Sequence, residues 1–338
     1  MLVTHGPLAG AGHTGPTLAV TASPAHPGFP GQAALGNGRL AVTVGNFDGV
    51  HRGHQAMLAR LKERAKELGV ESCVLTFEPH PREFFAPHAA PARLTRLAAK
   101  LAVLRDAGVD RVHVERFDAK FAAQSPERFV QDVLVGRLGC AWLLVGRDFR
   151  YGAKRSGDFA RLQASAGEHG FELEAMPEVQ IEGRRISSSA VRDALAGGDL
   201  EGAGVLLGRP YSIAGRVVHG DKLGRELGYA TANIRLPHKP PLAGIFVVET
   251  LGVPDAPRTP WPSVASIGVR PTVKEDAVPL LEVHLFDFDG DLYGRRLEVK
   301  FLHKLRDEAK FAGLETLKAA IDRDAADARN YFAAKNHG

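Results

Sequence analysis

Cysteine is scarce in this chain of 338 residues: only Cys73 and Cys140 occur, both inside apolar stretches. Small secreted proteins need a closely spaced, even set of cysteines, so a disulfide framework is excluded and two buried free thiols in a reducing compartment are predicted. No apolar run reaches the roughly 18 residues of a membrane span, and no basic segment with an apolar core opens the chain. We therefore expect a cytoplasmic protein that has no membrane partner.

A Gly-Lys dipeptide is also absent, which excludes a Walker-type phosphate loop. Neither sign of charge dominates, because 43 Lys and Arg face 39 Asp and Glu, and the positive residues are spread along the chain. Such a balance suits anionic small molecules as well as nucleic acid, but no nucleic-acid-binding motif occurs. We expect small-molecule substrates, no nucleic acid, and a monomer or weak homo-oligomer.

The first 38 residues are rich in Gly, Ala, Pro, Thr and His and follow no helical or strand period. This composition predicts a flexible tail over residues 1–38. Gly10, Gly12 and Gly15 match GxGxxG, but no strand precedes them and no helix follows. The match therefore does not predict a dinucleotide site.

Strand and helix patterns alternate over residues 39–204. The predicted strands are Leu40–Gly45, Ser72–Phe77, Val112–Glu115 and Ala141–Gly146, and the predicted helices are His54–Leu68, Thr95–Ala107 and a Ser125-capped segment ending at Leu138. This alternation is typical of an α/β, Rossmann-like module with a parallel sheet, which binds ligands at the carboxyl ends of its strands.

The pattern changes to short strands over residues 205–332. The predicted strands are Tyr211–His219, Ile245–Thr250, Ser263–Ile267, Leu281–Phe288 and Leu297–Leu302, and one helix is expected from Leu314 to Phe332. We predict a small antiparallel β-barrel with a C-terminal helix and a short tail at 333–338. Glycine fills four of eight positions in Gly197–Gly204, which predicts a hinge between the two modules.

The segment from Gly45 to His54 reads GNFDGVHRGH and lies where the first strand should end and the first helix begin. Helix N-termini bind phosphates through free N–H groups and a positive dipole end. His51 and His54 are three residues apart, so both can face one phosphate. A metal site, or loop histidines with ordinary partners, is the competing interpretation.

The His-x-Gly-His pattern resembles that of nucleotidyltransferases, which align two reactants and stabilise charge growing on the α-phosphate of ATP. The resemblance assigns catalysis to His51 and His54. The ATP-binding residues that it implies in this segment are Gly45, Asn46, Phe47, Gly49 and Gly53.

A second segment, RISSSAVR from Arg185 to Arg192, resembles the element with which nucleotidyltransferases close over ATP. We expect Arg185, Ser188, Ser189 and Arg192 to contact the phosphates. Ser189 stands where the family has Thr, which keeps the hydroxyl. Taken alone, the segment is better explained by a serine N-cap and a solvated arginine, and only its pairing with the histidine motif reverses this preference.

Two further loops, TFEPHP at 76–81 and VGRDFRYG at 145–152, narrow the resemblance to the prokaryotic bifunctional riboflavin kinase and FAD synthetase family. It implies that Asp148 helps to bind ATP. Arg147 departs from the family, which carries an acidic residue at that position.

The later module contains a glycine-punctuated loop, HGDKLGRELG, over residues 219–228. We predict that it cradles ATP phosphates through Gly220, Lys222, Gly224 and Arg225. The next segment, ATAN, resembles the Pro-Thr-Ala-Asn motif of riboflavin kinases. The resemblance implies that Thr231 and Asn233 bind Mg²⁺, for which hydroxyl and amide oxygens are suitable ligands, although Ala230 replaces the usual proline.

The resemblance assigns the role of catalytic carboxylate to Glu282 and flavin binding to Tyr229 and Arg306. Period-2 alternation places Glu282 and His284 on one face of a strand. Without the resemblance, Glu282 is typical of a solvated strand residue and Arg306 of an ordinary surface arginine.

The expected function is phosphorylation of riboflavin by ATP to give FMN, then adenylyl transfer from ATP to FMN to give FAD and pyrophosphate. Two alternatives stay open. One is an FAD synthetase whose barrel binds flavin without catalysis, and the other is a flavin-sensing regulator.

Overall fold

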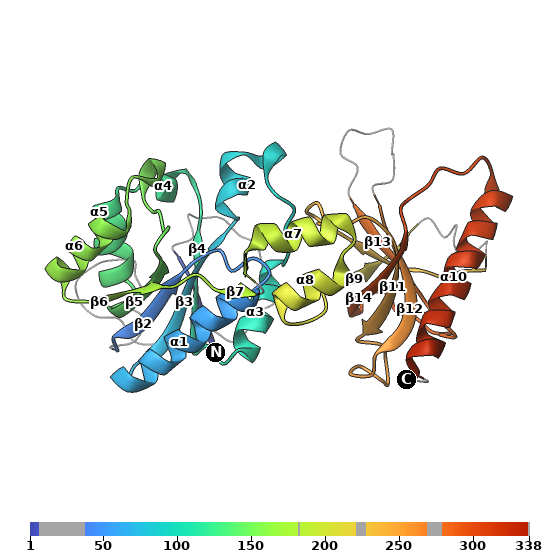
Figure 1. Ribbon diagram of the computed structural model, residues 1–338, viewed down its shortest axis with the longest axis horizontal. Coiled ribbons are helices and arrows are strands. Elements are labelled where there is room, and N and C mark those ends of the chain that lie inside the picture. Colours follow the sequence, from blue (N-terminus) through green and yellow to red (C-terminus); the bar gives the residue numbers. More distant parts are fainter. Residues whose placement is uncertain (7–37, 182, 221–227, 269–278, 337–338) are drawn as a thin grey trace. The chain divides into compact units, whose positions relative to one another are not determined.

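The computed structural model describes residues 1–6, 38–181, 183–220, 228–268 and 279–336. The chain forms two compact units (Figure 1). The sheet unit comprises Met1–Pro91 and Leu97–Ile186, and the barrel unit comprises Ala92–Arg96 and Ser187–Gly338. Each unit is described separately below.

The sheet unit is built on six parallel strands in the order β1-β4-β3-β2-β5-β6. They are β1 (Leu2–His5), β2 (Leu40–Val44), β3 (Glu71–Glu78), β4 (Arg111–Arg116), β5 (Cys140–Gly146) and β6 (Glu172–Met176). The predicted parallel sheet and its four predicted strands are confirmed. Because β3 and β5 flank β2 on opposite sides, the strand order reverses at β2, and a ligand crevice is expected at the carboxyl end of this strand.

The helices of the sheet unit follow the alternation expected from the sequence. They are α1 (Arg52–Leu68), α2 (Pro81–Phe85), η1 (Pro87–Ala89), α3 (Leu97–Asp106), α4 (Ala119–Ala122), α5 (Pro126–Arg128), the π-helical η2 (Phe129–Val135), η3 (Ala153–Arg155) and α6 (Phe159–His169). A short ribbon of β7 (Gln180–Ile181) and β8 (Arg184–Arg185) follows β6.

Both faces of this sheet are buried. Val42 and Leu75 pack in one apolar cluster with residues of η2 and α6. Ala41 and Val74 pack in a second cluster with residues of α1 and α3. Burial on both faces explains why the central strands are continuous apolar runs.

The two cysteines are free and buried, as predicted. Burial raises the pKa of the Cys73 thiol to about 12 and raises that of Cys140 as well. Both thiols are therefore protonated and unreactive at neutral pH.

The prediction of a flexible segment over residues 1–38 is wrong for its first residues. Leu2–His5 forms β1, which pairs in parallel with β4 over four residues. The run Leu-Val-Thr is suited to a strand, and it covers the edge that β4 would otherwise present. The glycine match at Gly10–Gly15 lies outside the described residues.

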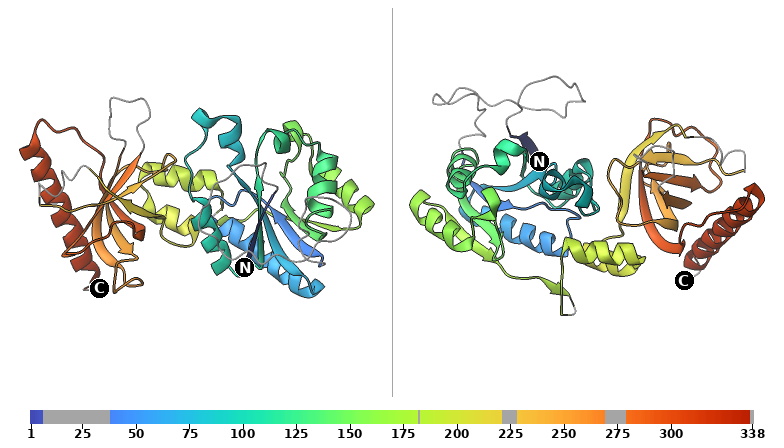
Figure 2. Two further views of the ribbon diagram at one scale, coloured as in Figure 1. Left: turned by 180° about the vertical axis from the view of Figure 1, so that it is seen from behind. Right: turned by 90° about the horizontal axis from the view of Figure 1, so that it is seen from above.

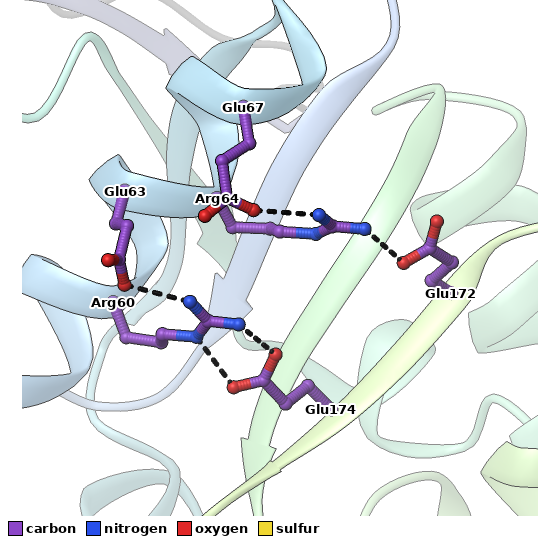
Figure 3. A network of polar contacts seen from close by, with 6 residues as sticks. All are labelled: Arg60, Glu63, Arg64, Glu67, Glu172 and Glu174. Atoms are coloured by element: carbon purple, nitrogen blue, oxygen red, sulfur yellow. Dashed lines mark hydrogen bonds and ion pairs between the residues drawn. The ribbon is translucent and has the colours of Figure 1, made fainter.

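Two arginines of α1 attach this helix to β6 (Figure 3). Arg60 donates two hydrogen bonds of 2.8 Å to the carboxylate of Glu174. Arg64 donates one of 2.6 Å to Glu172. These contacts fix α1 beside the sheet, and the N-terminus of α1 carries the histidine motif.

The barrel unit contains six antiparallel strands closed in the order β10-β13-β12-β11-β14-β9. Figure 2 shows the strands of this unit curving into a barrel. They are β9 (Ser212–Val218), β10 (Ala232–Arg235), β11 (Gly244–Leu251), β12 (Trp261–Gly268), β13 (Leu280–Leu285) and β14 (Arg296–Arg306). The predicted barrel and five of its strands are confirmed. The sixth strand, β10, was not predicted, because its first residues were interpreted only as part of the ATAN motif. The helix α10 (Leu314–Asn336) packs Ala325 and Ala328 against Val247, Val264 and Phe286, outside the barrel core.

The predicted hinge at Gly197–Gly204 is mostly helical. After α7 (Ser188–Gly197), only Gly198 and Asp199 interrupt the helix before α8 (Leu200–Leu207) begins. Asp199 caps α8 by accepting a hydrogen bond from the Gly202 N–H group. Leu200, Ala203 and Leu207 are buried in the barrel-unit core, and this burial outweighs the low helix propensity of the glycines.

Candidate active sites

The two histidines of the sheet unit lie together at the start of α1. His51 is the N-cap residue, and its ring accepts a hydrogen bond of 3.3 Å from the His54 N–H group. The two rings are stacked with centroids 3.7 Å apart. A β-carbon on Gly53 would lie 3.2 Å from the His51 ring, so the glycine lets this ring sit against the helix. Among the described residues, no group of three or more His, Cys, Asp or Glu side chains that could hold a metal ion is found.

The loop between β2 and α1 is strained. Phe47 and Val50 have positive φ angles of 49° and 43°. Left-handed backbone is costly for a β-branched residue and clusters at functional sites. The Phe47 ring lies 4.8 Å from the His54 ring. The strained loop thus packs directly against the histidine pair.

The imidazole of His54 is held in its neutral form. Burial lowers the pKa of His54 well below its ordinary value, and the charges of His51 and Lys100 lower it further. The Nδ1 atom of His54 is buried and has no hydrogen-bond partner among the described residues. A neutral imidazole can donate only one hydrogen bond to a ligand.

A pocket of about 570 Å³ opens at the carboxyl ends of the strands and is lined in part by Gly45, Asn46 and Asp148. Its walls are rich in aromatic side chains: Phe77, Phe85, Phe117, Phe121, Phe149 and Tyr151. Four cations also line it, namely Arg82, Arg150, Lys154 and Arg155. The lining therefore combines flat apolar surface with positive charge. The sequence singled out the segments that contain Phe77, Phe149, Arg150 and Tyr151, but it gave these residues no individual role and did not indicate Phe85, Phe117 or Phe121.

Asp148 and Arg185 form an exposed ion pair in the sheet unit. Arg185 donates a hydrogen bond of 2.8 Å to Asp148 and also lies 3.1 Å from Glu178. The hydrogen bond from Arg185 lowers the pKa of Asp148. Asp148 and Arg185, both predicted to bind ATP, are therefore brought together and form an ion pair with each other.

The predicted serine element begins a helix, as expected. Ser187 is the N-cap of α7 and accepts a hydrogen bond of 3.1 Å from the Ala190 N–H group. Arg192 donates a hydrogen bond of 2.6 Å to the carbonyl oxygen of Ala92. Ser188, Ser189 and Arg192 belong to the barrel unit, whereas the histidine pair belongs to the sheet unit. Their role at ATP stays a prediction.

Four residues predicted for the kinase site meet in one pocket of about 280 Å³ in the barrel unit: Tyr229, Thr231, Glu282 and Arg306. Glu282 on β13 is the cross-strand partner of Asn233 on β10. The predicted alternation is confirmed, because Leu281, Val283 and Leu285 are buried while Glu282 and His284 are half-buried. Lys222, Gly224 and Arg225 lie outside the described residues.

The side chain of Asn233 is enclosed next to this pocket. Asn233 is 6% exposed, and its Nδ2 atom donates a hydrogen bond of 3.3 Å to the Thr231 carbonyl oxygen. Its Oδ1 atom is buried without a hydrogen-bond partner among the described residues. A β-carbon on Gly220 would lie 2.5 Å from Nδ2, so only glycine allows this approach. Asn233 therefore keeps an uncommitted oxygen acceptor beside Thr231.

Helix α10 orients two residues of the barrel-unit pocket. Arg306 donates hydrogen bonds of 2.8 and 2.6 Å to Asp324, and its guanidinium lies 5.6 Å from the centre of the Phe311 ring. Tyr229 donates a hydrogen bond of 2.6 Å to Asp322. Burial and Asp322 raise the pKa of Tyr229 to about 12, so its hydroxyl stays protonated. The sequence did not indicate Asp322 or Asp324, since acidic residues on a terminal helix are usually solvated.

The fold and the two pockets define a nucleotide-dependent transferase that joins an α/β unit to a β-barrel. Residues 35–190 match the family model of FAD synthetase, and residues 207–332 match that of riboflavin kinase. The chain belongs to the family of bifunctional riboflavin kinase/FMN adenylyltransferases.

Relatives of that name match most of the chain. The one from Pseudomonas fluorescens is 53% identical over 297 residues, which cover 88% of this chain and 94% of the relative. The one from Escherichia coli strain K12 is 49% identical over 292 residues, which cover 86% of this chain and 92% of the relative. A crystal structure described as a macrolide-efflux protein from Streptococcus pneumoniae superposes with a TM-score of 0.71 at 28% identity, covering 87% of this chain and 95% of that one. No helix in the described part of the chain is long and apolar enough to cross a membrane.

Proposed function

We infer that this chain makes FAD in two steps, with riboflavin kinase chemistry in the barrel unit and FMN adenylyl transfer in the sheet unit. The observation that carries this inference is that each unit brings together its own set of predicted functional side chains. The histidine pair stands at the end of β2, and Thr231, Asn233 and Glu282 gather at the barrel pocket. A barrel that only binds flavin would not need these three polar groups together.

In the kinase step, Glu282 orients the terminal ribityl hydroxyl of riboflavin and accepts its proton. The hydroxyl oxygen forms a bond to the γ-phosphorus of ATP, the bond from this phosphorus to the β-phosphate oxygen breaks, and ADP leaves. Tyr229 and Arg306, both oriented by α10, hold the flavin. We propose that Gly220, Lys222, Gly224 and Arg225 bind the phosphates, the last three of which lie outside the described residues.

We propose that Thr231 and Asn233 hold Mg²⁺ in the barrel unit. The buried Oδ1 atom of Asn233 fits this role, because an oxygen acceptor without a partner is costly unless a ligand uses it. When bound, Mg²⁺ neutralises charge on the nucleotide phosphates. Thr231 adds a hydroxyl oxygen from the same pocket.

In the adenylyl-transfer step, a phosphate oxygen of FMN forms a bond to the α-phosphorus of ATP. The bond from this phosphorus to the β-phosphate oxygen breaks, and pyrophosphate leaves. His51 and His54 donate hydrogen bonds to the oxygens on which charge grows. Gly45, Asn46, Phe47, Gly49 and Gly53 let the nucleotide approach the end of β2, and Asp148 and Arg185 of the same unit add polar groups for its binding.

The aromatic pocket of the sheet unit suits the flavin ring of FMN. The rings of Phe77, Phe117 and Phe121 contact one another with centroids 5.6 to 5.8 Å apart. Phe85 is 65% exposed and lines the same pocket, so it offers apolar ring surface to a ligand. Arg82 and Arg150 can balance the charge of the FMN phosphate.

Single substitutions test this division of roles. Glu282→Gln should slow FMN formation from riboflavin about 10²-fold or more and leave FAD formation from supplied FMN at the wild-type rate. His54→Ala should slow FAD formation from supplied FMN and leave FMN formation from riboflavin at the wild-type rate. Glu249→Gln on strand β11, which does not pair with β13, and the exposed His88→Ala serve as controls, and each reaction is followed by chromatography. Wild-type FMN formation by Glu282→Gln would refute the kinase assignment, and loss of both activities by one folded variant would refute the division of roles.

A further inference from the structure

A buried cation that the proposed function does not use lies in the sheet unit. Lys100 on α3 is only 4% exposed. Lysine is almost never buried unless its ammonium group is paired or hydrogen-bonded. Its Nζ atom donates a hydrogen bond of 3.2 Å to Oγ1 of Thr76, which is fully buried on β3.

Thr76 connects Lys100 to the loop that carries the histidines. Its hydroxyl donates a hydrogen bond of 3.2 Å to the carbonyl oxygen of Asn46. The single hydroxyl proton goes to Asn46, so the oxygen is free to accept from Lys100. A continuous polar path therefore runs from α3 through β3 to the start of the strained loop.

Lys100 also acts on the histidine pair through its charge. The charged or titratable groups that act on His54 are His51, stacked on it, and Lys100, from the adjacent helix. Both disfavour a second positive charge on His54 and so lower its pKa. The ammonium of a lysine stays charged across the range in which a histidine titrates.

We propose that Lys100 is a positioning residue for adenylyl transfer: its ammonium supplies a fixed positive charge beside the histidine pair and, through Thr76, holds the loop that begins at Asn46. The proposal rests on the function proposed for the sheet unit. The α-phosphate gains negative charge in the transition state, and a preorganised cation stabilises it without taking up a proton. His54 then acts as a neutral hydrogen-bond donor, whose state does not vary with pH near neutrality.

A purely structural lysine is the alternative, and two variants separate the roles. Lys100→Met removes the charge and keeps most of the volume. Thr76→Val removes the bridging hydroxyl and keeps the charge. Lys62→Met is the control, because the Lys62 ammonium likewise donates a hydrogen bond within the sheet unit, to the carbonyl oxygen of Ala107, but Lys62 lies on α1 about two turns beyond His54.

The first readout is the titration of His54 by NMR, with the signal assigned by its loss in His54→Gln. In Lys100→Met the pKa of His54 should rise towards its ordinary value, whereas in Thr76→Val and Lys62→Met it should stay low. This readout requires no turnover, so it remains valid if the sheet unit proves to have another activity. If Lys100→Met does not fold, Lys100→Gln takes its place.

The second readout is FAD formation from FMN and ATP between pH 5.5 and 8. Lys100→Met should lower kcat about tenfold or more and add an inflection where His54 now titrates, with lower activity on the acidic side. Lys100→Arg should recover part of kcat and lose the inflection. An unchanged His54 titration in Lys100→Met, or an equal loss of kcat without an inflection in Lys100→Met and Thr76→Val, would overturn the proposal.

Discussion

The amide of Asn233 is the residue whose surroundings bear most directly on metal use by the barrel unit. Leaving a buried acceptor without a partner costs about 1–3 kcal/mol. Its Oδ1 atom is in that state among the described residues, and it lies beside Thr231 and across from Glu282. Such a cost is offset where a bound ligand becomes the partner of the acceptor oxygen.

Replacing this amide should therefore weaken metal activation of one reaction only. We expect Asn233→Ala to raise the Mg²⁺ concentration for half-maximal FMN formation about tenfold, the equivalent of about 1.4 kcal/mol. The measurement is a Mg²⁺ titration of initial rates at fixed ATP. Adenylyl transfer by the same variant is the internal control. An unchanged Mg²⁺ dependence of FMN formation would exclude Asn233 as a ligand.

Residues in short motifs were easier to predict than residues that meet through the fold. His51 and His54 are three positions apart, so local spacing alone predicts that they share a site. Lys100 reaches Thr76 from 24 positions away, and Arg306 is held by Asp324 from another element. In the sequence, Lys100 and Asp324 look like ordinary surface charges, because only the tertiary packing buries them.

Helix α1 is the element that presents the histidine pair, and its attachment to β6 is the clearest electrostatic contact of the sheet unit (Figure 3). The side chains of Arg60 and Glu174 are 34% and 33% exposed, so solvent screens their attraction in part. Exposed pairs contribute about 0.2–1 kcal/mol, and the bidentate geometry places this pair at the upper end of that range.

We expect Arg60→Gln to lower the free energy of unfolding at pH 7 by up to about 1 kcal/mol. The hydrogen bond from Arg60 lowers the pKa of Glu174, so the contribution is present above the ordinary glutamate pKa and is lost as the pH falls through the lowered value. Urea titrations of wild type and variant should therefore converge in acid. Arg64→Gln should cost less, since its partner Glu172 is 60% exposed. A constant difference at all pH values would contradict the ion-pair account.

The order of elements was largely predictable, and the exceptions have physical causes. Apolar runs predicted the buried strands of the sheet unit because burial imposes that pattern. The four residues of β1 were too few to show a period, and they become a strand only because β4 offers an edge. The glycines of α8 suggested a hinge, but contacts of Leu200 and Leu207 with the core stabilise a helix there.

At the scale of the molecule, each unit has its own apolar core and its own set of predicted functional side chains. The matched family regions end at residue 190 and resume at residue 207, and α7 and α8 span this interval. The module boundary between 204 and 205 stays a prediction, as do the oligomeric state and the cytoplasmic location. What the two units imply together is a sequence of reactions in which the product of the barrel unit is the substrate of the sheet unit.

A single time course tests this central claim most directly. Purified protein is given riboflavin, ATP and Mg²⁺, and riboflavin, FMN and FAD are separated by chromatography as the reaction proceeds. The account predicts that FMN forms first and FAD follows at its expense, with one ADP per FMN formed and one pyrophosphate per FAD. Absence of FMN from riboflavin, with FAD formed only when FMN is supplied, would contradict it and leave an FAD synthetase with an inactive barrel.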